Sequence, residues 1–219
     1  ARGGAGSWSL ALRDIKLAHS VFAMPFAILG GAMAVPAGAA AARTAGQVAL
    51  IVWCMVAART VAMLVNRVAD REFDAANPRT ARRAVASGAL PVRTAAGMIA
   101  AAAAAFVVGC AGFLVFGNWW PLALSVPALA LVSFYSFTKR FTALAHVFLG
   151  LALAASPVAA AIAVSPGSLG LDGSGLAPSG VATLLLAGFV ALWVAGFDVL
   201  YALQDLEFDR GAGLRSIPS

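Results

Sequence analysis

Charged residues are scarce in this sequence. Asp, Glu, Lys and Arg together make up 11% of its 219 residues, whereas about 25% is usual for a soluble domain. Hydrophobic residues make up 62% of the chain, and its mean hydropathy is positive. So high an apolar content indicates an integral membrane protein. Its spans should be helices, because a helix satisfies its backbone hydrogen bonds within one segment.

Cysteine and histidine are also rare. The two cysteines, Cys54 and Cys110, both lie in apolar segments, which favours small core residues over a disulfide or a metal pair. The two histidines, His19 and His146, have no further ligands at metal-binding spacing, and we expect both to be hydrogen-bonded core residues. No A-x-A-like site closes the first apolar segment, so we expect no cleavable signal peptide.

Six apolar segments predict the fold. Each is close to the roughly 20 residues that a helix needs to cross a bilayer. They cover residues 17–35, 47–65, 94–116, 119–138, 142–164 and 181–200. We therefore predict a single all-α domain over residues 1–219, folded as a polytopic transmembrane bundle of six spans. A loop rich in Gly, Ser and Pro at 165–180 should be flexible.

The positions of the basic residues predict an orientation. With a cytoplasmic N-terminus, all 15 Lys and Arg residues except Arg43 and Arg59 fall on the cytoplasmic side, as the positive-inside rule requires. Arg43 then lies outside, and Arg59 lies within the second segment. The net charge of +6 is therefore typical of a multi-pass protein of the inner (plasma) membrane. It does not indicate a nucleic-acid partner.

Two acidic motifs carry most of the functional information. Asp70 and Asp74 follow the second apolar segment, and Asp205 and Asp209 follow the sixth, each pair within the pattern Asp-x-Glu-Phe-Asp. Residues four apart lie on one face of a helix, so Asn66 joins the first pair in one polar stripe. The predicted orientation puts both motifs on the cytoplasmic side, where they offer the hard oxygen ligands that Mg²⁺ prefers. Ordinary surface charge at solvated helix ends is the alternative.

Two charged residues lie within apolar segments, where a charge indicates a functional site by default. Arg59 precedes Asn66 by seven residues, which places it about 10 Å deeper on the same helix face. Asp198 precedes Asp205 by the same interval. Two interpretations are open, namely a buried ion pair between Arg59 and Asp198, or a polar floor that binds a substrate carboxylate or hydroxyl. Tyr201, on the face of Asp205, is either a core residue or a substrate contact.

This combination of residues predicts a chemistry. Metal-bound carboxylates bind diphosphate, and Arg71, Lys139 and Arg140 on the same side would add charge-assisted contacts to its oxygens. A site within the membrane suits a lipid tail, which makes an allylic prenyl diphosphate the natural substrate. Metal and basic residues would stabilise the leaving diphosphate. An apolar cavity would shield the carbocation from water until an electron-rich acceptor attacks it.

From residue 16 onward the chain resembles the UbiA superfamily of intramembrane prenyltransferases. The resemblance rests on the motifs Asn66-x-x-x-Asp70-x-x-x-Asp74 and Asp205-x-x-x-Asp209. It also rests on the amino-acid sequences of residues 70–80, 135–140 and 196–205. The family commonly has nine spans, of which this chain supplies six, so the resemblance implies a C-terminally incomplete domain. The sequence of the loop 80–88 differs slightly from the family's usual Gly-Arg-x-Leu-Pro motif.

The resemblance also implies roles for individual residues. Two Mg²⁺ ions would bridge the four aspartates and the prenyl diphosphate, and Asn66 would help to hold this site. Arg71, Lys139 and Arg140 would bind the diphosphate. Arg59 matches a family position implicated in binding the carboxylate of the acceptor.

The amino-acid sequence around the motifs is similar to that of bacterial quinone-pathway members of the family. These transfer a polyprenyl group to 4-hydroxybenzoate, or to a dihydroxynaphthoate in the futalosine route to menaquinone, and both acceptors are open here. A UbiA-type transferase with another acceptor is one alternative. A transporter or channel with an acidic cytoplasmic vestibule is a second, although Asp172 is the only acidic residue predicted outside. A soluble prenyl diphosphate synthase would need amphipathic helices, whereas these segments are apolar all round.

Overall fold

Helices form the framework of the protein. The computed structural model describes residues 17–218, with side chains from Ala23 onward, so the predicted cytoplasmic residues Arg2, Arg13 and Lys16 and the side chain of His19 lie outside the described part. The α-helices are α2 (Leu17–Met33), α3 (Ala41–Ala69), α4 (Arg71–Ala76), α5 (Val92–Gly112), α6 (Trp120–Ala123), α7 (Ser125–Thr138), α8 (Ala145–Val164), α9 (Pro178–Ala202) and α10 (Leu206–Gly211). The 3₁₀ helices are η1 (Phe113–Phe116), η2 (Pro166–Ser168) and η3 (Leu203–Asp205).

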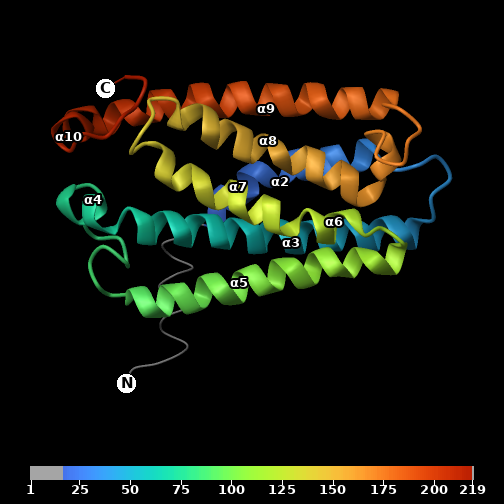
Figure 1. Ribbon diagram of the computed structural model, residues 1–219, viewed down its shortest axis with the longest axis horizontal. Coiled ribbons are helices and arrows are strands. Elements are labelled where there is room, and N and C mark those ends of the chain that lie inside the picture. Colours follow the sequence, from blue (N-terminus) through green and yellow to red (C-terminus); the bar gives the residue numbers. More distant parts are fainter. Residues whose placement is uncertain (1–16, 219) are drawn as a thin grey trace.

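The long helices lie side by side along the longest axis of the molecule (Figure 1). α3 packs against α5 and α7, while α8 packs against α9 and α2. The short helices α4 and α10 lie together at one end of the bundle (Figure 1). All six predicted segments are helical, which confirms the all-α fold.

Four of these helical segments are long and apolar enough to cross a membrane. They are Ala41–Ala69, Val92–Phe116, Ala145–Val164 and Pro178–Gly211. The other two predicted spans correspond to shorter apolar helices, described as Ala23–Met33 and Ser125–Thr138. The predicted span at 119–138 breaks at Leu124 between α6 and α7. Pro127 cannot donate a backbone hydrogen bond to the turn before it, and the break places it in the first turn of α7, where proline is tolerated.

The loop between α8 and α9, predicted to be flexible, has its own hydrogen-bonded structure. Leu169 and Leu176 form an isolated antiparallel bridge, and the backbone N–H of Ala177 donates to the carbonyl of Ser168 (3.1 Å). The Asp172 carboxylate accepts from the backbone N–H and the hydroxyl of Ser174. Composition alone did not indicate these local bonds.

Small residues let the helices approach closely. A Cβ at Gly30 of α2 would overlap the backbone of Pro157 in α8. In the same way, a Cβ at Gly150 of α8 would overlap the carbonyl oxygen of Ala191 in α9. Close backbone packing of this kind drives helix association in a bilayer, where burial of apolar surface contributes little. At Gly150 it holds α8 directly against the backbone of α9.

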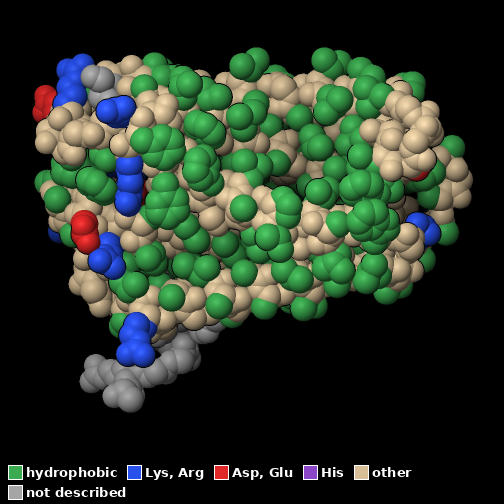
Figure 2. Space-filling model, in the orientation of Figure 1, with side chains coloured by type: hydrophobic (Ala, Val, Ile, Leu, Met, Phe, Trp, Pro, Cys, Tyr) green, Lys and Arg blue, Asp and Glu red, His purple; other side chains and the backbone are tan. Residues whose placement is uncertain are grey.

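On the face shown in Figure 2 most charged side chains gather at one end of the molecule, and the rest of that face is mostly hydrophobic. That end carries α4, α10 and the loop that joins α4 to α5. The loop is anchored because Leu90 and Val85 pack into a buried cluster with Leu64 of α3 and Met98 of α5. The loop therefore holds its polar residues in fixed positions above the bundle.

The close packing of α8 on α9 yields a stability prediction. We expect Gly150→Ala to lower the free energy of unfolding by about 1–3 kcal/mol, because overpacking forces the backbones apart. Gly188→Ala in α9 is the matched control, since a Cβ there meets nothing within 4 Å, and removing a helical glycine stabilises by about 0.5–1 kcal/mol. Thermal unfolding of the purified protein in detergent checks both variants. Equal melting temperatures for the two would contradict this packing.

Candidate active site

The first acidic motif lies where α3 meets α4. α3 ends at Asp70, whose φ of −93° and ψ of 7° separate it from α4 within the predicted polar stripe. Helix-type hydrogen bonds nevertheless span the junction, from the N–H of Asp70 to the Asn66 carbonyl (2.9 Å) and from the N–H of Asp74 to the Asp70 carbonyl (2.7 Å). The predicted polar stripe is therefore kept, with a kink at its centre. The second motif is likewise divided, with Asp205 in η3 and Asp209 in α10.

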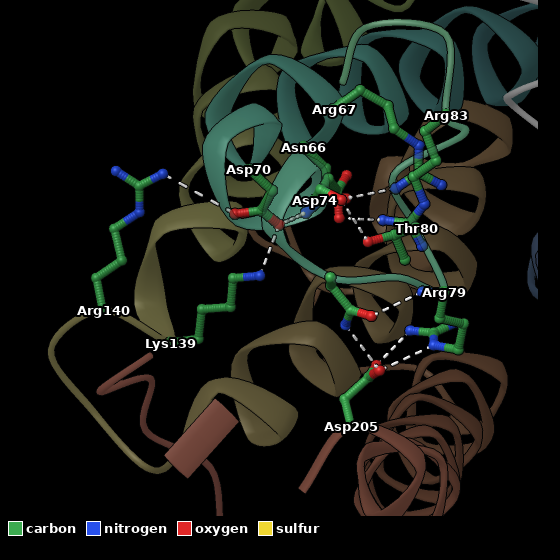
Figure 3. A network of polar contacts seen from close by, with 11 residues as sticks. Asn66, Arg67, Asp70, Asp74, Arg79, Thr80, Arg83, Lys139, Arg140 and Asp205 are labelled. Atoms are coloured by element: carbon green, nitrogen blue, oxygen red, sulfur yellow. Dashed lines mark hydrogen bonds and ion pairs between the residues drawn. The ribbon is translucent and has the colours of Figure 1, made fainter. Parts of the chain in front are cut away.

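Asp70 is almost completely buried, with 3% of its surface exposed. Its Oδ2 atom accepts a hydrogen bond from the side-chain amide of Asn66 (3.0 Å) and lies 2.7 Å from the Lys139 ammonium. Arg140 approaches Oδ1 at 3.9 Å (Figure 3). Lys139 and Arg140 follow α7, so the loop between α7 and α8 supplies the positive charge that a buried carboxylate needs.

Asp74 is also buried, and its partners come from the loop after α4. Arg83 donates to its Oδ1 (2.7 Å), and the Thr80 hydroxyl donates to its backbone carbonyl (3.0 Å) (Figure 3). The Arg83 guanidinium lies only nine residues along the chain. The loop between α4 and α5 therefore folds back over the first motif.

Asp205 connects the second motif to the loop that follows the first. Its carboxylate accepts hydrogen bonds from the Asn77 amide (3.0 Å) and from Nε of Arg79 (2.8 Å), with a second, close contact to Nη2 of Arg79 (Figure 3). The hydrogen bond to Asp205 raises the pKa of Arg79 above its usual value. Arg79 thus stays charged and links η3, which follows α9, to the α4–α5 loop by a two-pronged contact.

Two of the predicted site residues, Arg71 and Asp209, form no salt bridge with the other residues of the site. Arg71 is half exposed, pairs with its neighbour Glu72 (3.0 Å) and does not line the cavity described below. Asp209 lines that cavity, and in the described part of the chain it has no cationic side chain within salt-bridge distance. The segment after it folds back toward the α7–α8 loop, with the N–H of Arg215 donating to the Lys139 carbonyl (2.9 Å).

A cavity of about 820 Å³ begins at the motif aspartates and extends between the helices. Deeper in the bundle its walls are largely alanine and other apolar side chains, and they reach Ile51 of α3 and Phe113 of η1 toward the opposite end. Ile51 lies in the first half of α3, away from the end that carries the motif, and Phe113 directly follows the last residue of α5. The cavity therefore runs along much of the bundle. A polar mouth and an apolar interior suit an amphipathic molecule with a charged head.

Arg59, Asp198 and Tyr201 all line this cavity, as a polar floor requires. The alternative of an ion pair between Arg59 and Asp198 is wrong, because Asp198 pairs with His146 of α8 (Nδ1 to Oδ2, 2.7 Å). Nε of Arg59 is buried and has no hydrogen-bond partner among the side chains of residues 23–218. The Tyr201 ring lies against the Arg79 guanidinium, 5.8 Å from its central carbon.

Sequence reasoning missed four residues of the site. Asn77, Arg79 and Arg83 contact the motif aspartates, and His146 contacts Asp198. The high density of basic residues in the α4–α5 loop signalled the two arginines. It did not show which aspartate each would reach. Nothing in the local sequence paired His146 with α9.

The oxygens of the first motif fit a hard cation. Oδ1 of Asp70 and Oδ2 of Asp74 are buried and accept no hydrogen bond from the described residues. Such carboxylate oxygens are the ligands that Mg²⁺ takes, with waters or phosphates completing its shell. Among the side chains that the structure describes, residues 23–218, no group of three acidic, His or Cys side chains lies close enough to hold a metal by itself. The donor set is therefore suitable, and a bound diphosphate would have to complete it.

The fold and the site together define a class, namely a helical membrane protein with an acidic and basic cluster at the mouth of an apolar cavity. The UbiA prenyltransferase family model matches residues 23–219, and the chain belongs to that family.

Relatives and solved structures agree with this assignment. The chain is 35% identical to the 4-hydroxybenzoate octaprenyltransferase of Methylococcus capsulatus over 78% of this chain and 53% of that protein, and 34% identical to that of Paracidovorax citrulli over 72% and 48%. It thus spans about half the length of these curated relatives. A UbiA homologue from Aeropyrum pernix superposes with a TM-score of 0.77 at 32% identity, over 93% of this chain and 70% of that one. A homologue from Archaeoglobus fulgidus, solved with GPP and Mg²⁺, shares the fold at 22% identity, with a TM-score of 0.66 over 95% and 68%.

The Arg79–Asp205 contact can be measured as a coupling energy. In a double-mutant cycle with EDTA present, we expect Arg79→Gln and Asp205→Asn to be coupled by about 1 kcal/mol, since charged hydrogen bonds contribute roughly 1.5–3 kcal/mol and partial exposure of Arg79 reduces this. Thermal unfolding of the two single variants and the double variant gives the value. A cycle of Asp205→Asn with Arg93→Gln, an exposed arginine of α5, should show no coupling. Additive effects of Arg79→Gln and Asp205→Asn would contradict the contact.

Proposed function

We propose that this protein is an Mg²⁺-dependent aromatic prenyltransferase that moves a polyprenyl group from an allylic diphosphate to a hydroxylated aromatic acid. The observation that carries the proposal is the pairing of buried carboxylates with basic side chains at the mouth of the apolar cavity. The relatives named octaprenyltransferase and the homologue solved with GPP and Mg²⁺ support it.

The diphosphate would bind at the mouth of the cavity. Asp70, Asp74, Asp205 and Asp209, with Asn66 beside them, would hold Mg²⁺, which when bound neutralises the charge of the departing diphosphate. Lys139 and Arg140 would contact diphosphate oxygens directly, and Arg79 and Arg83 lie close enough to the same aspartates to join them. Arg71 carries the positive charge that diphosphate binding needs, but it does not line the cavity. To bind the diphosphate it would have to break its salt bridge with Glu72.

The cavity would hold the rest of the substrates. Its apolar walls suit the prenyl tail, and its polar floor suits the acceptor, with Arg59 binding the carboxylate and Asp198 and Tyr201 facing the ring. In the reaction, the bond between the allylic carbon and the diphosphate oxygen breaks, and its electron pair leaves with the diphosphate. A ring carbon then forms the new C–C bond and loses its proton. The walls would keep water from the carbocation meanwhile.

The acceptor would be 4-hydroxybenzoate, in ubiquinone biosynthesis, and the names of the relatives favour this choice. A dihydroxynaphthoate, in menaquinone biosynthesis, is the other candidate, and product analysis with both acceptors separates them. The protein would lie in the bacterial inner membrane with its charged end toward the cytoplasm. The clustering of charge at one end of the face shown in Figure 2 favours this proposal over a transporter, which needs polar groups along a path across the membrane.

Removal of a motif carboxylate tests the metal assignment. We expect Asp70→Asn and Asp205→Asn each to reduce prenyl transfer at least a hundredfold, because each removes a ligand from ions that stabilise the leaving group, and EDTA to abolish transfer in the unmodified protein. Asp172→Asn, in the α8–α9 loop, is the matched control and should keep full activity. Product formation from a polyprenyl diphosphate and 4-hydroxybenzoate, identified by mass, is the measurement. Full activity in either site variant would remove the metal from the proposal.

Arg59 gives a test of acceptor binding. We expect Arg59→Gln to raise KM for 4-hydroxybenzoate roughly tenfold or more while KM for the prenyl diphosphate stays unchanged, since only the acceptor loses a charged hydrogen bond. Steady-state kinetics with each substrate varied in turn measures both constants. An equal rise in both would assign Arg59 to the structure of the site as a whole.

A further inference from the structure

His146 and Asp198 form a side-chain pair that neither motif contains. His146 is the second residue of α8, and Asp198 lies near the end of α9. Nδ1 of His146 and Oδ2 of Asp198 are 2.7 Å apart, and the two side chains are 6% and 33% exposed. Because α8 and α9 pack closely through Gly150 and Ala191, the two helices hold the pair at a fixed separation.

The two members of the pair are buried to different degrees. The imidazole is enclosed, and its Nε2 has no hydrogen-bond partner in the described residues, so Asp198 is its one polar contact. The carboxylate is more open and lines the cavity. Among the described side chains, residues 23–218, only its Oδ2 takes part in a hydrogen bond. The second oxygen, Oδ1, is therefore left for a ligand in the cavity.

We propose that His146 is a positioning residue of the acceptor subsite, which holds the Asp198 carboxylate so that its second oxygen accepts a hydrogen bond from the ring hydroxyl of the aromatic acceptor. The inference rests on the proposed function and deepens it. His146 acts through Asp198 and does not itself contact the acceptor.

The physical basis is the cost of a carboxylate that is free to turn. An aspartate side chain at the wall of a cavity has several rotamers, and an acceptor that needs one of them binds more weakly while the others are populated. The N–H of a buried imidazole selects one rotamer by its hydrogen bond. Asp198 is then ready before the acceptor arrives, as a preorganised site requires.

Binding of two acceptor analogues tests this role without the transfer reaction. 4-Hydroxybenzoate and benzoate differ only in the ring hydroxyl, so the ratio of their dissociation constants reports the contact of that hydroxyl. In the unmodified protein, measured by calorimetry in detergent, we expect 4-hydroxybenzoate to bind roughly ten- to a hundredfold more tightly, as a hydrogen bond to a charged group gives. In His146→Leu the ratio should fall toward one.

Two further variants separate positioning from general damage. His146→Asn keeps an N–H donor near the place of Nδ1 and should restore most of the ratio. Val147→Ala, at the exposed neighbouring residue that does not line the cavity, is the control and should keep it. If His146→Leu does not fold, Asp198→Asn takes its place in the same measurement, and it too should lose the ratio.

The outcomes distinguish the two proposals. An unchanged ratio in His146→Leu, or in Asp198→Asn, overturns the inference while leaving a prenyltransferase intact. A ratio near one in the unmodified protein, with prenylated product still formed, overturns the inference in the same way. Loss of product with every aromatic acid tried overturns the proposed function itself, and the inference with it.

Discussion

The structure depends on the need to neutralise carboxylates that are buried at the end of an apolar bundle. Asp70 and Asp74 are almost completely enclosed, and a buried ion is costly unless a partner lies close and in good geometry. Each partner comes from a different part of the chain. Lys139 follows α7, whereas Arg83 belongs to the α4–α5 loop. These pairs tie the loops at the charged end to one another and so fix the mouth of the cavity.

The same pairs place the basic residues where a diphosphate would need them. In this structure Lys139, Arg83 and Arg79 each neutralise one motif aspartate. Divalent cations on those aspartates would take over this neutralisation and free the basic side chains for an anionic substrate. The proposed metal site and the proposed diphosphate site are thus two uses of one set of charges.

Below the charged end, the helices are held by shape and not by charge. Gly30 and Gly150 allow backbone contacts that no larger residue permits, and they bring α2 and α9 close to α8. The small side chains that permit this packing also leave the interior unfilled, which produces the long apolar cavity. His146 and Asp198 meet at the wall of that cavity because α8 and α9 are so closely packed. Precision at the polar floor therefore follows from glycine positions further along the helices.

The sequence by itself determined the all-α membrane fold, the family and the aspartate motifs, because apolar runs of about 20 residues and fixed four-residue spacings are local signals. The sequence did not predict the kink at Asp70, because the point where a helix ends depends on what the next segment packs against. Only the tertiary structure decided that Arg79 and Arg83 reach the aspartates, that Arg71 turns to Glu72, and that His146 takes Asp198 in place of Arg59. Each of these pairings except that of Arg71 joins residues from separate loops or helices, and contacts between such elements depend on packing angles that no local spacing encodes.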